Sequence, residues 1–223
     1  MKRNREINWR ISFDYRNDLS GFSFSVYFGY ILCKGGFFYK YGDVDSEDRL
    51  KKINNNPNKF KISIVLILIS SVGVFALTLM LFILFSPYNI ILGVIWTIFR
   101  IGEFLILMYN EKTSCGLINI ARQYSGSSGA EKKSLCDLGR TIFQTLNYRF
   151  VFSQFLFGVG TLTYSILFVI YGVIPPSIAW LGLVAGIFVS IVNGLKLVKR
   201  NFKILDLFGL LAILFEAIFG GVH

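Results

Sequence analysis

Four charged side chains interrupt or border the long apolar segments of this sequence, and they are the residues best placed to do chemistry: Arg100, Glu103, Arg149 and Glu216. At the centre of a bilayer a charge costs about 2.5 to 3.5 kcal/mol on insertion scales, so Arg100 is expected to have a partner. Glu103 lies one helical turn away on the same face, and Glu216 is expected at a similar depth in the last helix. Arg149, at the membrane entry of its own helix, falls near the level of Glu103. We therefore predict an intramembrane polar cluster in which Arg100 faces Glu216 and Glu103 faces either arginine.

The sequence leaves the role of this cluster open. In one interpretation, the charged pairs only hold helices together and bind nothing. In a second, they line a cavity for an anionic or zwitterionic ligand such as a lipid headgroup or small metabolite. In a third, Glu103 or Glu216 is a catalytic carboxylate. No catalytic residue, metal ligand or cofactor site is assigned. The one histidine, His223, cannot form a histidine pair, the three cysteines form no CxxC motif, and no GxxxxGK[ST] motif occurs.

Small residues recur every four positions in a later apolar segment, at Gly182, Gly186, Ser190 and Gly194. Such a ribbon lets a second helix approach closely. We expect it to pack against another helix of the same chain, because a chain with many helices offers many partners. A homo-oligomer, or contact with another membrane protein, is the alternative.

The composition requires a membrane around these residues. The 223-residue chain is 54% hydrophobic and 16% charged, against about 25% charged residues in soluble domains. Two uncharged runs, 62–99 and 150–195, exceed the length of a buried core helix, and a spanning helix needs about 20 apolar residues. Pro175 and Pro176 divide the second run into two helices. Residues 60–223 are therefore expected to form an all-α integral membrane helical bundle with five spans, near 62–86, 88–109, 147–173, 177–196 and 204–222.

The N-terminal region, residues 1–59, contains a weaker sixth candidate span near 21–39. This segment is rich in aromatic residues but alternates them with small polar residues at a strand-like period. It is either a poor first membrane helix or an interfacial or buried aromatic segment. A loop is expected over 43–61, where an Asn-rich run surrounds Pro57.

A polar stretch, 110–140, separates two of the predicted spans. Its Ser/Gly-rich run at 125–129 predicts a flexible joint, and Ser128 with Glu131 fits a capping box that opens a new helix. Apolar residues then follow at spacings of three and four. The helix of the span near 147–173 is therefore expected to begin as an amphipathic helix outside the membrane.

Positive charge is distributed unevenly along the chain. Of the 23 Lys and Arg residues, 22 lie in 1–61, 112–149 and 196–203, and the short turns at 86–89 and 172–177 contain none. If five helices span, these 22 share one side, which the positive-inside rule assigns to the cytoplasm. The net charge of +10 then faces lipid headgroups, so membrane lipids are the expected partners and nucleic acid is not.

Several short motifs follow one another in a recognisable order. They are an Asn-rich lead at 56–60, Pro-Tyr-Asn at 87–89, Ile-Phe-Arg-Ile-Gly-Glu at 98–103, Phe-Gly-Val-Gly at 157–160, Ile-Pro at 174–175 before Trp-Leu-Gly at 180–182, and Leu-Phe-Glu at 214–216. Over about residues 54–220 the chain thereby resembles the domain of unknown function 4386 family, small multi-pass membrane proteins of prokaryotes. The resemblance implies six membrane helices, an all-helical fold, the plasma membrane as location and no established activity.

Three classes of function follow from these observations. The leading hypothesis is a non-enzymatic binding or accessory module of the cell membrane, because the sequence shows no catalytic constellation. A component of a small-solute transporter is the second class, and it predicts paired discontinuous helices. A lipid-active membrane enzyme that uses Glu103 or Glu216 is the third.

Overall fold

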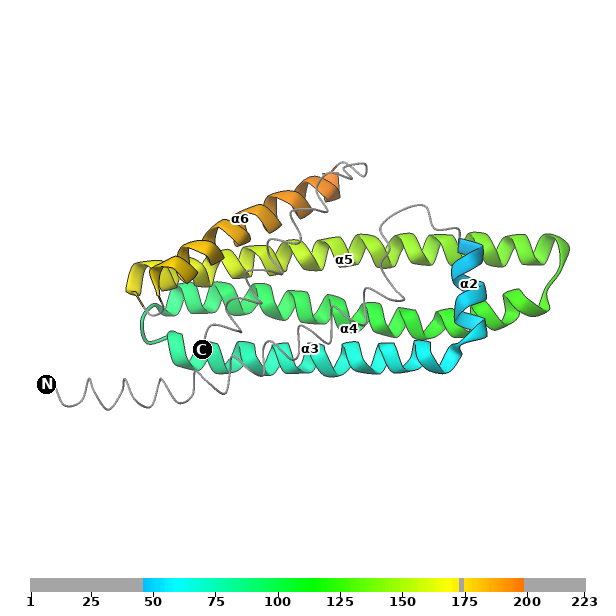
Figure 1. Cartoon of the computed structure of the whole chain (residues 1–223), viewed down its shortest axis with the longest axis horizontal. Coiled ribbons are helices and arrows are strands. Elements are labelled where there is room, and N and C mark those ends of the chain that lie inside the picture. Colours follow the sequence, from blue (N-terminus) through cyan, green and yellow to red (C-terminus); the bar gives the residue numbers. More distant parts are fainter. Residues whose placement is uncertain (1–45, 173–174, 199–223) are drawn as a thin grey trace, which may run out of the picture.

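The structure is a computed structural model that describes residues 46–172 and 175–198. This part of the chain contains five helices and no strand, so its predicted all-helical fold is confirmed. The helices are α2 (Ser46–Asn55), α3 (Pro57–Phe85), α4 (Ile90–Gly126), α5 (Gly129–Tyr171) and α6 (Pro176–Val198), as Figure 1 shows.

Four of these helices, α3 to α6, are long and apolar enough to cross a membrane. Their outward faces carry large apolar side chains with exposures such as 63% for Ile69, 72% for Ile83, 61% for Ile98 and 63% for Ile170. A soluble monomer rarely exposes so extensive an apolar surface, whereas hydrocarbon chains solvate it. These helices correspond to the predicted spans near 62–86, 88–109, 147–173 and 177–196, and the predicted spans near 21–39 and 204–222 lie outside the described residues.

The helix bounds correct two sequence-based predictions. The loop predicted over 43–61 is wrong for most of its length, because α2 and the first turn of α3 occupy it; only Asn56 separates the two helices, and Pro57 is the first residue of α3. Proline is well tolerated there, since its missing N–H would have no helical partner. The helix that contains the span near 88–109 is also longer than predicted, at 37 residues, whereas α5, at 43 residues, begins well before its span, as expected. A fall in hydropathy along the sequence marks where a helix leaves the membrane, but the helix itself can continue beyond that point.

The turn between α4 and α5 lies at the predicted joint. It consists of residues 127 and 128, and α5 begins at Gly129 with Ser128 as its N-cap. The Ser128 side chain makes no cap hydrogen bond, so the predicted capping box with Glu131 is not formed. At the other end of α5, Gly172 has a φ of 59°, the left-handed conformation that commonly ends a helix.

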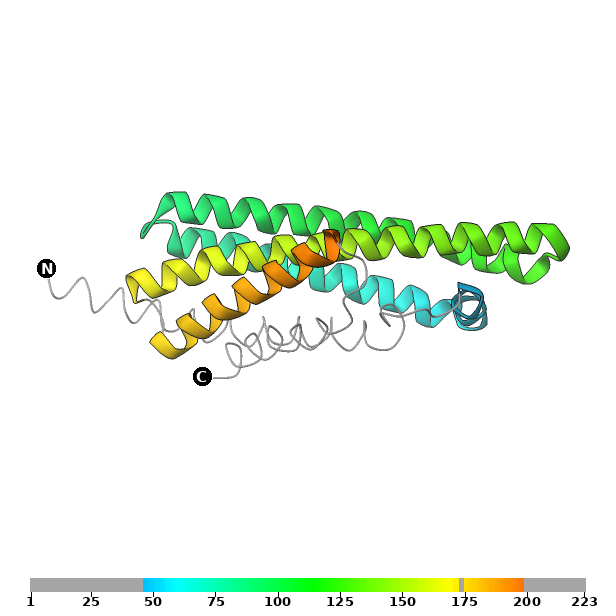
Figure 2. The same cartoon turned by 90° about the horizontal axis from the view of Figure 1, so that it is seen from above.

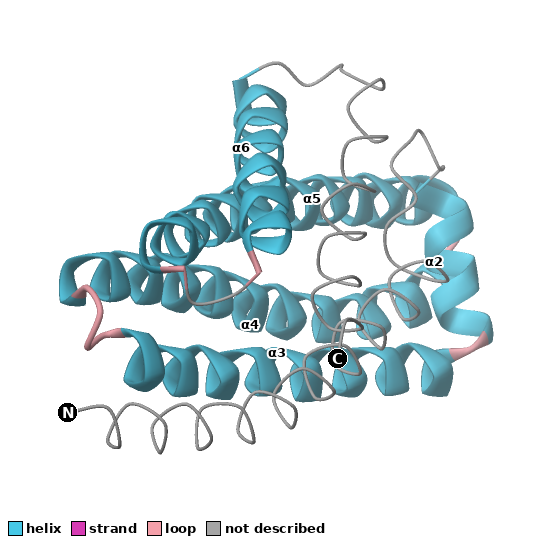
Figure 3. Ribbon diagram, turned by 60° about the vertical axis from the view of Figure 1, so that its left-hand side comes forward, coloured by secondary structure: helices cyan, strands magenta, loops and turns pink. Residues whose placement is uncertain are grey.

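The helix α4 runs antiparallel to both α3 and α5, and α6 packs on α5 at an inclination (Figure 3). The short helix α2 crosses the other three near the end opposite the two short turns (Figures 1 and 2). Leu50 and Ile53 of α2 pack there with Phe60, Leu117 and Leu146 in a buried core. We call α2 together with residues 110–126 and 129–147 the projecting unit; its α4 part alone extends about 25 Å at 1.5 Å per residue.

The small-residue ribbon of α6 faces α5 of the same chain. A Cβ atom built on Gly186 would lie 2.7 Å from the backbone nitrogen of Leu162, and one built on Gly158 would lie 2.7 Å from the backbone nitrogen of Ser190. Further along the ribbon, Gly194 faces the Phe155 ring at 3.5 Å. Gly182 is buried as well. The two backbones therefore approach closely because Gly158 and Gly186 have no side chains at the crossing.

Replacing Gly186 by Ala is expected to push α6 away from α5, because backbone atoms cannot rotate aside as a flexible side chain can. We expect a loss of about 1 to 3 kcal/mol in the free energy of unfolding. Gly116→Ala is the matched control, since a Cβ atom there meets nothing within 4 Å. Unfolding in detergent measures both variants, and equal stability of the two would contradict the close packing.

Electrostatic contacts hold the projecting unit together outside the apolar spans. Glu47 of α2 accepts a hydrogen bond from Lys51, with an N–O distance of 2.8 Å, and it also interacts with Tyr124 of α4. Both contacts favour the ionised carboxylate, so they lower the pKa of Glu47. The ammonium group of Lys132, from α5, lies 5.0 Å from the centre of the Tyr124 ring. Residues from three helices therefore meet at this point.

Glu47→Gln is expected to lower stability at neutral pH and to have no effect in acid. A carboxyl group whose pKa falls on folding stabilises the fold above its unfolded pKa, and this contribution is lost as the pH falls through the folded pKa. Unfolding midpoints of wild type and variant should thus differ at pH 7 and converge only once the pH has fallen below the folded pKa of Glu47, which lies under the ordinary Glu value of about 4.3. A difference that stays constant over this range would contradict the charged contact.

Candidate functional site

One face of α4 buries polar side chains in the interior of the bundle. Arg100, Glu103, Asn110 and Ser114 recur at spacings of three, seven and four, which place them on one side of a helix. The same side carries the buried Trp96 and Leu107. This face packs between α3 and α5. The bundle is thus apolar outside and partly polar inside, as hydrocarbon surroundings require.

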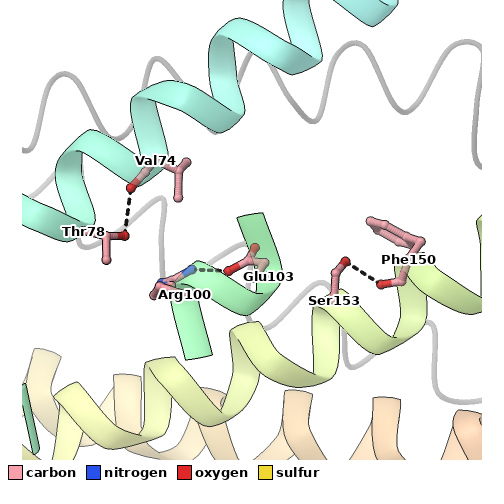
Figure 4. A network of polar contacts seen from close by, with 6 residues as sticks. All are labelled: Val74, Thr78, Arg100, Glu103, Phe150 and Ser153. Carbon is pink, nitrogen blue, oxygen red and sulfur yellow. Dashed lines mark hydrogen bonds and ion pairs between the residues drawn. The ribbon is translucent and has the colours of Figure 1, made fainter. Parts of the chain in front are cut away.

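Arg100 and Glu103 form an ion pair inside one helix. The Arg100 Nη1 atom donates to Glu103 Oε2 at 3.0 Å, and only 7% of each side chain is exposed. Figure 4 shows the pair on α4, between the ribbons of α3 and α5. A charge buried this deeply is tolerated because its partner cancels it locally.

A residue from α5 completes the surroundings of the pair. The Arg100 guanidinium lies over the Phe157 ring, with 4.5 Å between its central carbon and the ring centre. An arginine over an aromatic face gains about 2 kcal/mol when water is excluded. Gly160 of α5 lies beside the same side chain, since a Cβ atom there would be in ordinary contact with Arg100 Nε at 3.7 Å. The arginine thereby ties α4 to α5.

Hydroxyl groups near the pair donate within their own helices. The Thr78 hydroxyl of α3 donates to the Val74 carbonyl at 2.9 Å, and the Ser153 hydroxyl of α5 donates to the Phe150 carbonyl at 2.8 Å (Figure 4). Bonds of this kind satisfy a hydroxyl in a medium that offers no water. These hydroxyl groups therefore need no partner from a neighbouring helix.

Other buried polar atoms make no hydrogen bond within the described part of the chain. These are Trp96 Nε1, Asn110 Oδ1, Thr161 Oγ1 and Ser165 Oγ. Buried polar groups are ordinarily paired with protein or with ordered water. They could therefore hydrogen-bond water or a small polar molecule. Among the same described residues, no group of three or more His, Cys, Asp or Glu side chains could hold a metal ion.

Arg149 lies away from Arg100 and Glu103 and contacts other residues of α4. The Arg149 guanidinium, from α5, lies over the Tyr109 ring at 4.5 Å and donates to the Thr113 hydroxyl at 3.4 Å. These two α4 residues are about 9 and 15 Å from Glu103 along the helix axis. The sequence predicts Arg149 near the level of Glu103 because depth is counted from residue 147, where the membrane span is expected to begin, whereas packing of α5 against α4 sets the actual level. Glu216 lies outside the described residues.

Sequence reasoning missed two residues of this interior: Phe157 of α5, which covers Arg100, and Asn110 of α4, which is buried. Phe157 was noted as part of a motif and was not recognised as the aromatic partner of Arg100. Asn110 is the first residue of the polar stretch over 110–140, yet it is 1% exposed and donates to the Leu146 carbonyl at 3.3 Å. Its spacing of seven from Glu103 was the available signal, since seven residues are two helical turns.

Glu103→Leu and Arg100→Met are each expected to destabilise the bundle strongly. Either change leaves one buried charge without the ion-pair partner described above, and breaking a buried pair in this way costs about 3 to 5 kcal/mol. Both variants should be recovered from membranes in low yield and should unfold at lower temperature in detergent. Glu131→Gln, an exposed change, is the control. Wild-type stability of either single variant would show that the pair contributes nothing.

Comparison with known proteins places the chain in a family. No curated protein and no solved structure matches it. The model of the family described as Domain of unknown function (DUF4386) matches residues 24–221. This match begins well before the resemblance noted at about 54–220, so it includes residues of the N-terminal region as well. Because the match covers most of the sequence, the chain belongs to the DUF4386 family.

Proposed function

We propose that this protein is a non-enzymatic binding or accessory module of the cell membrane. The observation that supports it best is the closed geometry of the Arg100–Glu103 pair. Each charge is engaged by the other, and the arginine also rests on Phe157. A pair held this way stabilises the contact between two helices, whereas a catalytic acid or base must be directed at a substrate. The pair is therefore a structural tie in this proposal.

The alternative functions have less support in the geometry. A transporter of small solutes would present paired discontinuous helices at the midplane, and α3, α4, α5 and α6 are each continuous over their described lengths. A lipid-active enzyme would use Glu103 or Glu216, but Glu103 is bonded to Arg100. The accessory role needs neither a moving gate nor an accessible carboxylate.

The projecting unit is the surface on which this role would be exerted. It carries exposed cations on all three of its helices, among them Lys51, Lys112 and Lys133, whereas the turn between α3 and α4 contains no charge. By the positive-inside rule we assign the projecting unit to the cytoplasmic side of the plasma membrane. A partner protein or lipid surface would meet it there.

The double variant Arg100→Met with Glu103→Leu tests the structural reading of the pair. Apolar residues of similar volume often replace a buried ion pair without loss of stability. We therefore expect the double variant to recover the yield and unfolding midpoint that each single change loses. Mass spectrometry of the material purified in mild detergent should also find the same bound lipids and small molecules as in wild type.

The opposite result has a definite meaning. A double variant that folds but loses a small molecule present in the wild-type preparation would identify the pair as a ligand site, contrary to the proposal. A double variant no more stable than the single variants would show that the charges are needed for more than mutual neutralisation.

A further inference from the structure

The helices α4 and α5 pack along each other, and we call the outward-facing side of their line of contact, at Leu105, Tyr109, Arg149 and Phe152, the groove. It lies where the outer surface changes from apolar to polar. On α4, the exposed large apolar side chains end at Tyr109, which is 54% exposed, and Lys112 follows as an exposed cation. On α5, Tyr148 is 51% exposed and Arg149 comes next. Tyrosine and basic residues at such a boundary are typical of the headgroup level of a bilayer. The groove therefore lies at the membrane surface on the side of the projecting unit.

Arg149 is held at this level by contacts from α4. Its guanidinium stacks over the Tyr109 ring at 4.5 Å, and its Nη1 atom lies 3.4 Å from the Thr113 hydroxyl. The side chain is half-buried, so part of it stays accessible. No carboxylate within the described residues forms an ion pair with it. A fixed positive charge at headgroup depth is thus available to an anion.

Apolar side chains lie directly below this charge. Leu105, one turn deeper than Tyr109 on α4, is 59% exposed, and Phe152, three residues deeper than Arg149 on α5, is 41% exposed. The helices approach closely at the bottom of the groove, where a Cβ atom on Gly102 would lie 3.1 Å from the Leu156 side chain. A cation above an apolar track matches a molecule with an anionic head and a hydrocarbon tail.

We propose that this groove binds an anionic phospholipid, with the phosphate at Arg149 and an acyl chain along Leu105 and Phe152. A guanidinium presents paired N–H donors that match phosphate oxygens, and stacking on Tyr109 holds the group at this level. Lys112, adjacent in sequence to Thr113, adds a second cation at the same level. The assignment shares the membrane position with the proposed function but does not depend on the role of Arg100 and Glu103.

Native mass spectrometry of the full chain in mild detergent tests the assignment. The chain is titrated with phosphatidylglycerol and with phosphatidylcholine, and the ratio of the two bound populations is measured. Arg149→Gln should reduce the preference for phosphatidylglycerol about fivefold, since one cation near a membrane surface contributes about 1 kcal/mol. Arg140→Gln, which removes an exposed cation 3.9 Å from Asp137 on the projecting unit, should leave the preference unchanged. An unchanged preference in Arg149→Gln, or an equal loss in both variants, would overturn the proposal.

Two further arms separate other occupants of the groove. Inorganic phosphate in large excess should not displace the lipid, because it has no chain to bury; displacement would show that the site takes free phosphate. A dimer that disappears with Arg149→Gln would show that a second copy of the chain occupies the groove. Either result would overturn the lipid assignment.

A measurement on the wild-type chain covers the case in which Arg149→Gln does not fold. Phosphatidylglycerol with a photoactivatable group in its acyl chain should label peptides that contain Leu105 or Phe152, and the matching phosphatidylcholine should label them several-fold less. Equal labelling by both lipids, or labelling confined to other helices, would contradict the site.

Discussion

The structure depends on the inability of hydrocarbon to pair with polar or charged groups. An arginine in the apolar part of α4 has to be neutralised by the protein itself, and Glu103 one turn away does so at 3.0 Å. Phe157 from α5 then covers the guanidinium. This one requirement orients α4, because the face that carries Arg100 must point inward, and it selects which face of α5 lies opposite. The apolar residues on the remaining faces are left to contact lipid.

The inner face of α4 is buried both in the membrane-spanning part of the bundle and in the projecting unit outside it. It continues from Trp96 in the apolar part of α4 to Tyr124 near its end, and buried residues follow it throughout. The outer face changes at Tyr109, where exposed apolar residues give way to exposed polar ones. Inside the membrane the core is closed by neighbouring spans, and beyond it α2 supplies Leu50 and Ile53 instead. A single continuous helix thus couples the bundle to the projecting unit, so a contact made on that unit is made on a body rigidly joined to the membrane.

Much of the fold could be predicted from the sequence, and the wrong prediction of a loop over 43–61 has a physical cause. Uncharged runs of sufficient length identified the four described spans, and Pro175 and Pro176 identified the break before α6. The loop predicted over 43–61 was wrong because polar composition was read as absence of structure, whereas α2 is amphipathic and buries Leu50 in a core formed by other helices. Hydropathy reports the solvent around a segment. It does not report whether a polar segment finds a surface on which to pack.

The sequence by itself determined the medium, the minimum number of long helices, and the spacing that puts Arg100 and Glu103 within one turn, because these depend only on composition and on the pitch of an α-helix. Tertiary structure alone decided that the ribbon containing Gly186 faces Leu162 of α5, and that Arg149 meets Tyr109 and not Glu103. The level of one helix against another is set by the sum of many small packing contacts along both. No local pattern in a single chain segment contains that sum.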